Sequence, residues 1–190
     1  MIQVANEWNH LDLLRVAEMQ YKLALGVLTA CNSSDDLTFD YYDEFTWGKH
    51  SATREELALT KEQERFAATS LEHTATYLMV VQIDSALKDT VPDHLNHRDV
   101  DIRSASRIAW LLRNAFAHNP FAPMWKVHGQ RDNQTYAVKD VIVLKTSGLN
   151  DQLVTRSHCG GPLALLRLLQ FTKRVVAERM ASSYGTDNGT

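Results

Sequence analysis

The residues whose types and spacing suit chemistry best lie near the end of an apolar segment, residues 107–120, which reads RIAWLLRNAFAHNP. Arg113, Asn114 and His118 interrupt its apolar pattern. On a regular helix Asn114 and His118 are four residues apart and share a face, so the amide can hydrogen-bond the imidazole and fix its tautomer. A helix C-terminus also favours a positively charged imidazole. The pattern therefore predicts a histidine prepared for proton transfer.

The placement of Arg113 relative to His118 depends on the last turn of this helix. The two residues are five apart, which puts them about 140° apart around a regular helix. Their side chains converge only if the last turn loosens or bulges, and Pro120 favours such a disturbed turn. The alternative interpretation of these residues is a solvated helix end with a capping asparagine and a C-terminal histidine.

The stretch Arg113-Asn114-Ala-Phe-Ala-His118 resembles the signature of the HEPN superfamily (higher eukaryotes and prokaryotes nucleotide-binding domains), which is an arginine, a polar residue and a histidine four to six residues after the arginine. The resemblance is specific over residues 105–120 and extends to the whole chain through its helical pattern. Toxins of this family that pair with nucleotidyltransferase antitoxins carry a tyrosine two residues after the histidine. This chain has Pro120 there, so a role that depends on tyrosine modification is not expected.

The resemblance implies metal-independent cleavage of RNA in a cleft shared by two protomers. The 2′-hydroxyl attacks the adjacent phosphate, a base removes its proton, an acid protonates the leaving 5′-oxygen, and a cation stabilises the phosphorane. His118 is expected to do the acid–base work, Arg113 to clamp phosphate oxygens, and Asn114 to orient His118 or donate to phosphate. Because one histidine cannot easily serve as acid and base in one step, a homodimer that supplies a second copy is expected.

Three interpretations of the chain follow from these residues. The first is an endoribonuclease that acts as a toxin or phage-defence effector, with RNA as substrate and an antitoxin protein as a partner. The second is a catalytically inactive HEPN-like module that dimerises and binds a nucleotide or a partner protein. The third is a helical scaffold in which the motif is accidental. Neither a metal nor a cofactor is expected in any of them.

Charge is distributed unevenly along the chain, although its net value is only −3 at pH 7. Residues 1–98 carry 8 Lys and Arg against 16 Asp and Glu, whereas residues 99–190 carry 12 against 7. An RNA partner is therefore expected to meet the second half. Arg107, Lys173 and Arg174 are the weaker candidates for binding phosphate, and the alternative for the last two is the solvated face of an amphipathic helix. If the basic residues of the last two helices share a face, they form a basic cleft on an acidic body.

Two further polar groups could belong to a site. Residues 94–101 (HLNHRDVD) superficially offer metal ligands, but they follow Pro92 and lack an HExxH context, so we interpret them as a polar loop with an aspartate that caps the next helix. Glu72 and His73 could face the same cleft as the motif, and a surface pair is the favoured interpretation.

Four amphipathic segments must position these residues. Apolar residues at spacings of three and four predict helices over about 8–30, 60–88, 100–118 and 162–180. Thr60 and Gln63 form a capping-box pattern, Pro120 ends the third helix, and Pro162 opens the last one. Residues 32–52 have no helical period. We expect a long connection with a short strand or 3₁₀ turn whose aromatic residues pack inward, and which could gate the cleft or dock an antitoxin.

Alternating segments before the last helix predict a small antiparallel β insertion over about residues 121–158. The segments MWKVHG, QTYAVKDVIVL and QLVTRS are expected to supply two or three strands. The expected fold is therefore mostly α, a bundle of about four main helices with this insertion before the last one. We expect one domain over residues 1–182 and a flexible tail over 183–190.

The cysteines and the hydropathy of the chain indicate in which cellular compartment the protein is expected. Cys31 and Cys159 form neither a CxxC nor a close Cys/His pair, which fits a reducing cytoplasm. The N-terminal sequence lacks a basic segment followed by an apolar stretch, and no apolar run approaches the ~18 residues of a membrane span. Neither secretion nor membrane insertion is expected.

Overall fold

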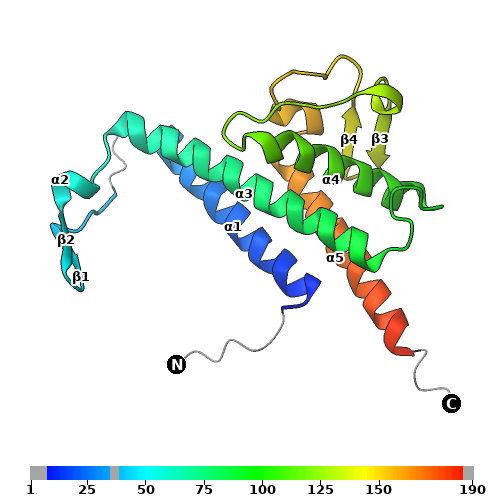
Figure 1. Cartoon of the computed structure of the whole chain (residues 1–190), viewed down its shortest axis with the longest axis horizontal. Helices are drawn as coiled ribbons and strands as arrows, with labels where there is room; N and C mark the ends of the chain where they lie inside the picture. Colours follow the sequence, from blue (N-terminus) through cyan, green and yellow to red (C-terminus); the bar gives the residue numbers. More distant parts are fainter. Residues whose placement is uncertain (1–7, 35–38, 186–190) are drawn as a thin grey trace.

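The computed structural model describes residues 8–34 and 39–185, and side chains only up to Ser182. Its elements confirm a mostly α fold with small antiparallel sheets. The helices within the described residues are α1 (His10–Ser33), α2 (Arg54–Leu57), α3 (Lys61–Thr90), α4 (Val100–His118) and α5 (Pro162–Gly185), with 3₁₀ turns at η1 (Gly129–Arg131) and η2 (Arg156–Cys159). Figure 1 shows α1 and α3 running side by side, with α5 along them and α4 above.

The long helices α1 and α3 each begin at a side-chain cap, and the cap of α3 is the one that the sequence predicts. Asn9 accepts a hydrogen bond from the backbone N–H of Asp12 at the start of α1. Thr60 and Gln63 form the expected capping box at the start of α3. In α1 the buried residues recur every three or four positions, which is the spacing of one helix face; they are Leu14, Ala17, Tyr21, Ala24, Leu28 and Cys31.

The helix that carries the motif has the predicted bounds, Val100–His118. The Asp99 side chain accepts hydrogen bonds from the backbone N–H groups of Asp101 and Ile102, which confirms the predicted aspartate cap. Asn119 leaves the helix in an extended conformation, immediately before Pro120. The helix is α-helical through His118, with neither a 3₁₀ nor a π turn, so the loosened last turn is absent.

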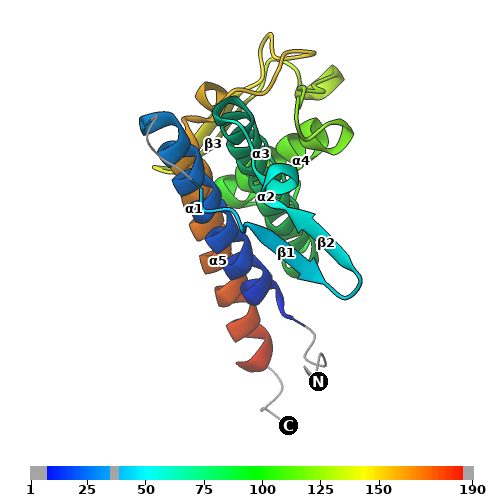
Figure 2. The ribbon, with the colours of Figure 1, turned by 90° about the vertical axis from the view of Figure 1, so that its left-hand side faces the viewer.

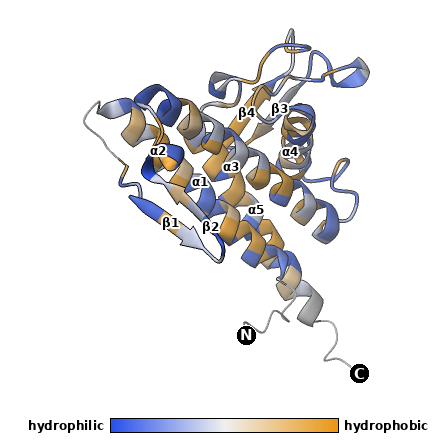
Figure 3. Ribbon diagram, turned by 60° about the vertical axis from the view of Figure 1, so that its left-hand side comes forward, coloured by the Kyte–Doolittle hydropathy of each residue, from blue (hydrophilic) through white to orange (hydrophobic). Residues whose placement is uncertain are grey.

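One continuous core joins α1, α3, α4, α5 and the β insertion. Its largest fully buried side chains include Trp125, Tyr21, Met79, Ile83, Leu112 and Leu168. Figure 3 shows apolar and polar segments alternating along each of the long helices. The last helix continues through Gly185, beyond the expected end near Met180, and residues 186–190 of the expected tail lie outside the described residues.

The β insertion contains a hairpin that packs on α4. Strand β3 (Thr135–Val138) pairs with β4 (Ile142–Lys145), so QTYAVKDVIVL forms both strands of one hairpin. Ile142 and Leu144 are buried while Val143 and Lys145 are exposed, as expected for a strand with one face on a core. The segments MWKVHG and QLVTRS meet in a single bridge, Met124 to Leu153. The indole Nε1 of fully buried Trp125 donates to His158 Nδ1 at 2.9 Å and ties the insertion together.

The long acidic-aromatic connection forms a hairpin that the sequence analysis did not resolve. Strands β1 (Glu44–Trp47) and β2 (His50–Thr53) pair around Gly48, which has a positive φ of 61°. This hairpin stands off one end of the α1 and α3 pair, away from β3 and β4 (Figure 1), and in Figure 2 it faces the viewer in front of the helices. The expectation that its aromatic residues pack inward is wrong for Tyr42, Phe45 and Trp47, and Trp47 is 77% exposed. Residues 35–38 of the connection lie outside the described residues.

Across residues 8–34 and 39–185, none of the helices combines the length and the apolar character that a membrane span requires.

Candidate functional site

Arg113 is held in place by a buried acid on the neighbouring helix. Its Nη1 lies 2.8 Å from Oδ2 of Asp84 on α3. The Asp84 side chain is 4% exposed, whereas that of Arg113 is 46% exposed. A guanidinium has five N–H donors in a rigid fork, so one contact fixes its direction and leaves donors at the surface. Arg113 is therefore an oriented, half-exposed cation.

His118 is the last residue of α4, and its side chain is exposed. The backbone N–H groups of Phe121 and Ala122 donate to the Asn119 side chain, which closes the turn after the helix. Asn114 is half-buried, and the described contacts include no hydrogen bond between its amide and His118. In this conformation the amide therefore does not orient the imidazole as predicted. Because α4 stays regular, Arg113 and His118 of one chain project about 140° apart.

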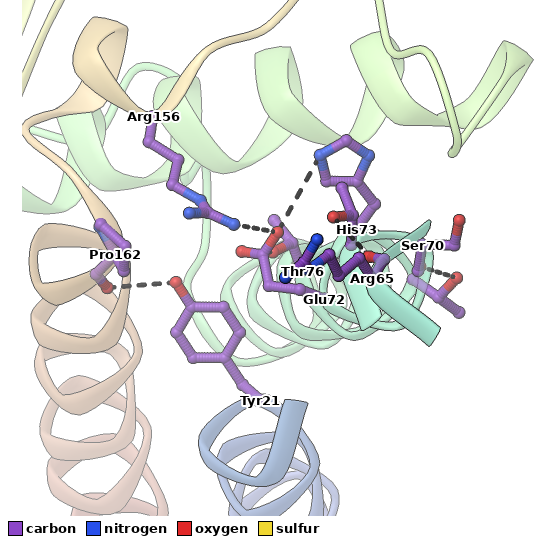
Figure 4. Close-up of polar contacts among 10 residues, drawn as sticks. Tyr21, Arg65, Ser70, Glu72, His73, Thr76, Arg156 and Pro162 are labelled. Atoms are coloured by element: carbon purple, nitrogen blue, oxygen red, sulfur yellow. Dashed lines mark hydrogen bonds and ion pairs between the residues drawn. The ribbon is translucent and has the colours of Figure 1, made fainter. Parts of the chain in front are cut away.

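A second polar cluster is centred on a buried carboxylate beside the last turn of α4. Glu72 is 2% exposed, which corrects the expectation of a surface pair. Arg156 Nη2 lies 2.9 Å from Glu72 Oε2, the Thr76 hydroxyl donates to Oε1 at 3.2 Å, and His73 Nε2 lies 3.9 Å from Oε2. Figure 4 shows Arg156 and His73 approaching the carboxylate from opposite sides. A polar group buried this deeply has to be hydrogen-bonded, and these contacts provide its partners.

This cluster is connected to both the core and the motif helix. The His73 ring lies edge-on to Phe116, with ring centroids 6.3 Å apart, and Phe116 precedes His118 by two residues. On its other side Tyr21 of α1 donates from its hydroxyl to the carbonyl of Pro162 at 3.2 Å. Burial, followed by the negative charge of Glu72, raises the pKa of Tyr21 above its ordinary value. The enclosed space between Glu72 and Phe116 is only about 30 Å³, room for little more than one water molecule.

The buried thiol beside this cluster has no nucleophilic character. Cys159 lines the same small cavity, and burial raises the pKa of its thiol to about 12. A thiol attacks as the thiolate, so a group that stays protonated at neutral pH is inert. Cys31, in a different part of the core, is also buried and free. The chemistry of the Glu72 cluster therefore consists of hydrogen bonds and a carboxylate–guanidinium pair.

The weaker phosphate candidates lie in different surroundings and do not form one basic face. Lys173 Nζ lies 2.8 Å from Oε2 of Glu18, and this lysine holds the pKa of the Glu18 carboxyl below its usual value, with help from Lys22. The Arg174 guanidinium lies over the Phe171 ring, 5.4 Å from its centroid. Arg107 lines a cavity at the other end of α4 from His118. Among these three, Arg107 is the residue that lines a cavity described for residues 8–34 and 39–185.

The acids that position the arginines were not predicted from the sequence. Asp84 and Glu72 were not connected with Arg113 and Arg156, although both acids fall within the helical repeat of Ala75, Met79 and Ile83 on α3. A charged residue in an apolar stripe is the signal that could have found them, because an acid in that position needs a buried partner. Within the described residues, no group of His, Cys, Asp and Glu side chains could hold a metal ion, residues 94–101 included.

Comparisons of this chain with protein-family models, curated proteins and solved structures found no match.

Proposed function

We propose that this chain is a metal-independent endoribonuclease of HEPN type, which acts as a homodimer and uses Arg113, Asn114 and His118. The observation that carries the proposal is the pair between Arg113 and Asp84: a half-exposed guanidinium, fixed at 2.8 Å by a buried carboxylate, on the last turns of the helix that ends in exposed His118. A cation held in advance where charge develops stabilises a transition state without reorganising.

The chemistry assigns one role to each group. A base removes the proton of the 2′-hydroxyl, the 2′-oxygen forms a bond to phosphorus, and the bond from phosphorus to the 5′-oxygen breaks as that oxygen receives a proton. The products are a 2′,3′-cyclic phosphate and a 5′-hydroxyl. His118 moves the protons, and the N–H groups of Arg113 that do not contact Asp84 bind the phosphorane oxygens.

The regular end of α4 supports a shared site. Because Arg113 and His118 of one chain point about 140° apart, they do not converge on one phosphate. A two-fold axis beside the end of α4 would supply the second arginine and histidine. The exposed small side chain of Ala117 lies between them and permits close approach of another helix. The two free cysteines agree with a reducing cytoplasm, and the role that the motif suggests is that of a toxin or phage-defence effector with an antitoxin partner.

The test is cleavage of RNA in EDTA with analysis of the product ends. Wild type is expected to release 2′,3′-cyclic phosphate ends, and His118→Ala to lose roughly 10²- to 10⁴-fold in rate. His50→Ala, an exposed histidine of the distant hairpin, is the matched control and is expected to cleave normally. Arg113→Lys keeps a partner for buried Asp84 but loses the planar fork, so its activity is expected to fall without loss of folding.

Two results would remove the proposal. Activity that survives His118→Ala would show that the motif does not carry out the reaction. Intact RNA together with measurable nucleotide binding would favour the inactive HEPN-like module instead. A mixture of His118→Ala and Arg113→Lys chains, refolded together, is expected to regain part of the activity if the cleft combines two protomers.

A further inference from the structure

A strongly basic cavity lies at the start of α4, away from the motif. It has a volume of about 460 Å³ and opens between the first turns of α4, the η1 turn and strand β3. Three arginines, a histidine and a tyrosine supply its chemistry: Arg103, Arg107, Arg131, His128 and Tyr136. The remaining lining consists of two glutamines, so no carboxylate among the described residues lines the cavity.

Neutral groups hold all three arginines in position. Arg107 donates from Nε to the carbonyl of Leu95 and from Nη2 to Oδ1 of Asn96, each at 3.0 Å. Arg103 Nη1 donates to the carbonyl of His97 at 2.9 Å. These acceptors fix the side chains without cancelling their charge, since no ion pair in the described part of the chain involves either arginine.

Arg131 is positioned by an aromatic ring instead. Its guanidinium lies over the Trp110 ring, 4.0 Å from the centroid, and Trp110 projects from the same face of α4 as Arg103 and Arg107. Stacking leaves the in-plane N–H donors of the guanidinium unused by the ring. Three like charges therefore converge on one cavity, an arrangement that is unfavourable until an anion enters.

The geometry points to a binding site for the phosphate of a nucleotide, which deepens the proposed function and rests on it where the ligand is RNA. Forked guanidinium groups match two phosphate oxygens bidentately, a geometry that a single-atom anion such as chloride cannot provide. Tyr136 adds a half-buried aromatic ring on which a base can stack, and the cavity is large enough for one nucleotide. The phosphate can come from an RNA chain or from a free nucleotide.

The position on α4 connects this pocket with the cleavage motif. Arg107, Asn114 and His118 lie within about 40° of one another around the helix, because their separations of seven and four residues are close to whole turns. The rise from Arg107 to His118 is about 16 Å, a span of a few nucleotides. An RNA strand held in the pocket would therefore follow one face of α4 to His118.

The binding test uses the full chain with His118→Ala, which is expected to slow cleavage enough for binding to be measured. Binding of a fluorescent 12-nucleotide oligouridylate is measured by anisotropy over a range of salt. Arg107→Gln and Arg131→Gln are each expected to weaken binding about tenfold. Each is also expected to reduce the slope of log affinity against log salt concentration by about one. Arg167→Gln removes an exposed arginine on α5 and is expected to leave the affinity unchanged.

A second arm distinguishes the two sources of phosphate. Adenosine monophosphate and inorganic phosphate are titrated by calorimetry into wild type and the arginine variants. Binding of the monophosphate that depends on the arginines, without binding of the oligonucleotide, would assign the pocket to free nucleotides. If neither probe responds to Arg107→Gln or Arg131→Gln in variants that melt cooperatively, the inference is overturned.

The outcomes separate this inference from the proposed function. Oligonucleotide binding that depends on the arginines, in a wild-type protein that never cleaves, would support the pocket and contradict the nuclease. Cleavage with unchanged affinity in both variants would support the nuclease and contradict the pocket. Arg107→Lys, which keeps the charge but loses the fork, is expected to bind with intermediate affinity.

Discussion

Two groups of arginines in this molecule differ in what holds them. Arg113 and Arg156 each contact a carboxylate that is buried on α3, Asp84 and Glu72. The arginines of the basic pocket are instead held by backbone carbonyls, an asparagine and a tryptophan ring. A guanidinium beside a carboxylate is fixed in direction and has a countercharge at one edge, whereas one held by neutral acceptors has no countercharge in contact with it.

The difference explains how one chain can have a net charge of −3 and still offer an anion site. Some of the acids, Asp84 and Glu72 among them, are buried in the bundle, where they pair with arginines. The uncompensated arginines gather at the other end of α4. Folding rather than composition therefore decides where a phosphate can bind.

The largest expected effect comes from removing a paired arginine. Arg156→Met leaves the buried charge of Glu72 without its ion-pair partner and is expected to lower the free energy of unfolding by about 3 kcal/mol. Arg103→Met, in the basic pocket, removes a charge from a group of like charges and is expected to change it by less than about 1 kcal/mol. Urea unfolding at pH 7 measures both values. Equal losses in the two variants would erase the distinction between the groups.

A smaller effect is expected in the coupling between partners. A double-mutant cycle of Asp84→Asn and Arg113→Met is expected to give an interaction free energy of about 2 kcal/mol, because Asp84 is buried. The matched cycle of Asn96→Ala and Arg107→Met joins a guanidinium to a neutral, exposed amide, so about 0.5 kcal/mol is expected. Denaturant unfolding of the wild type and the six variants provides both numbers, and a larger coupling in the second cycle would contradict the comparison.

The smallest effect concerns the pH dependence of stability and the buried thiol of Cys159. The pKa of Cys159 rises to about 12 on folding, from an ordinary value of 9.0, because the thiol is buried. Between these values the unfolded chain loses a proton that the folded chain keeps, so stability is complete below pH 9 and falls as the pH rises. Cys159→Ala is expected to reduce the stability lost between pH 9 and pH 10 by about 1 kcal/mol.

Unfolding measured in urea at pH 8, 9 and 10 checks this expectation. Cys31→Ala serves as the control for loss of a buried cysteine from a different cluster. Identical alkaline slopes in wild type and Cys159→Ala would show that the thiol is not protected from ionisation by the fold.

The sequence predicted most of the helical framework because helix limits depend on neighbouring residues. Thr60 and Gln63 marked one start, Asp99 another, and Pro120 an end, and the structure confirms each of them. The exposed aromatic residues around Trp47 were predicted to point inward, because aromatic residues usually do. In a two-stranded hairpin that stands off the bundle, there is no core within reach to bury them.

The candidate site was predictable only in part. Arg113 and His118 were predicted from a motif within six consecutive residues. Arg107 was predicted from its charge alone. Arg131, His128 and Tyr136 were not found, because they lie on a turn and a strand that reach α4 only after the insertion folds. The sequence of α4 therefore contains no signal that predicts their contact with it.

The sequence by itself therefore determined where the long helices run, the mostly α class of the fold, and the position of the motif at a helix end. These features follow from hydrogen bonds and apolar spacing within a few residues. The tertiary structure alone decided which arginines are paired with a carboxylate and which are held by neutral groups. Arg113 on α4 contacts Asp84 on α3, 29 positions earlier in the chain, and Arg156 on η2 contacts Glu72 on α3. Packing between distant segments therefore fixed the surroundings of each guanidinium.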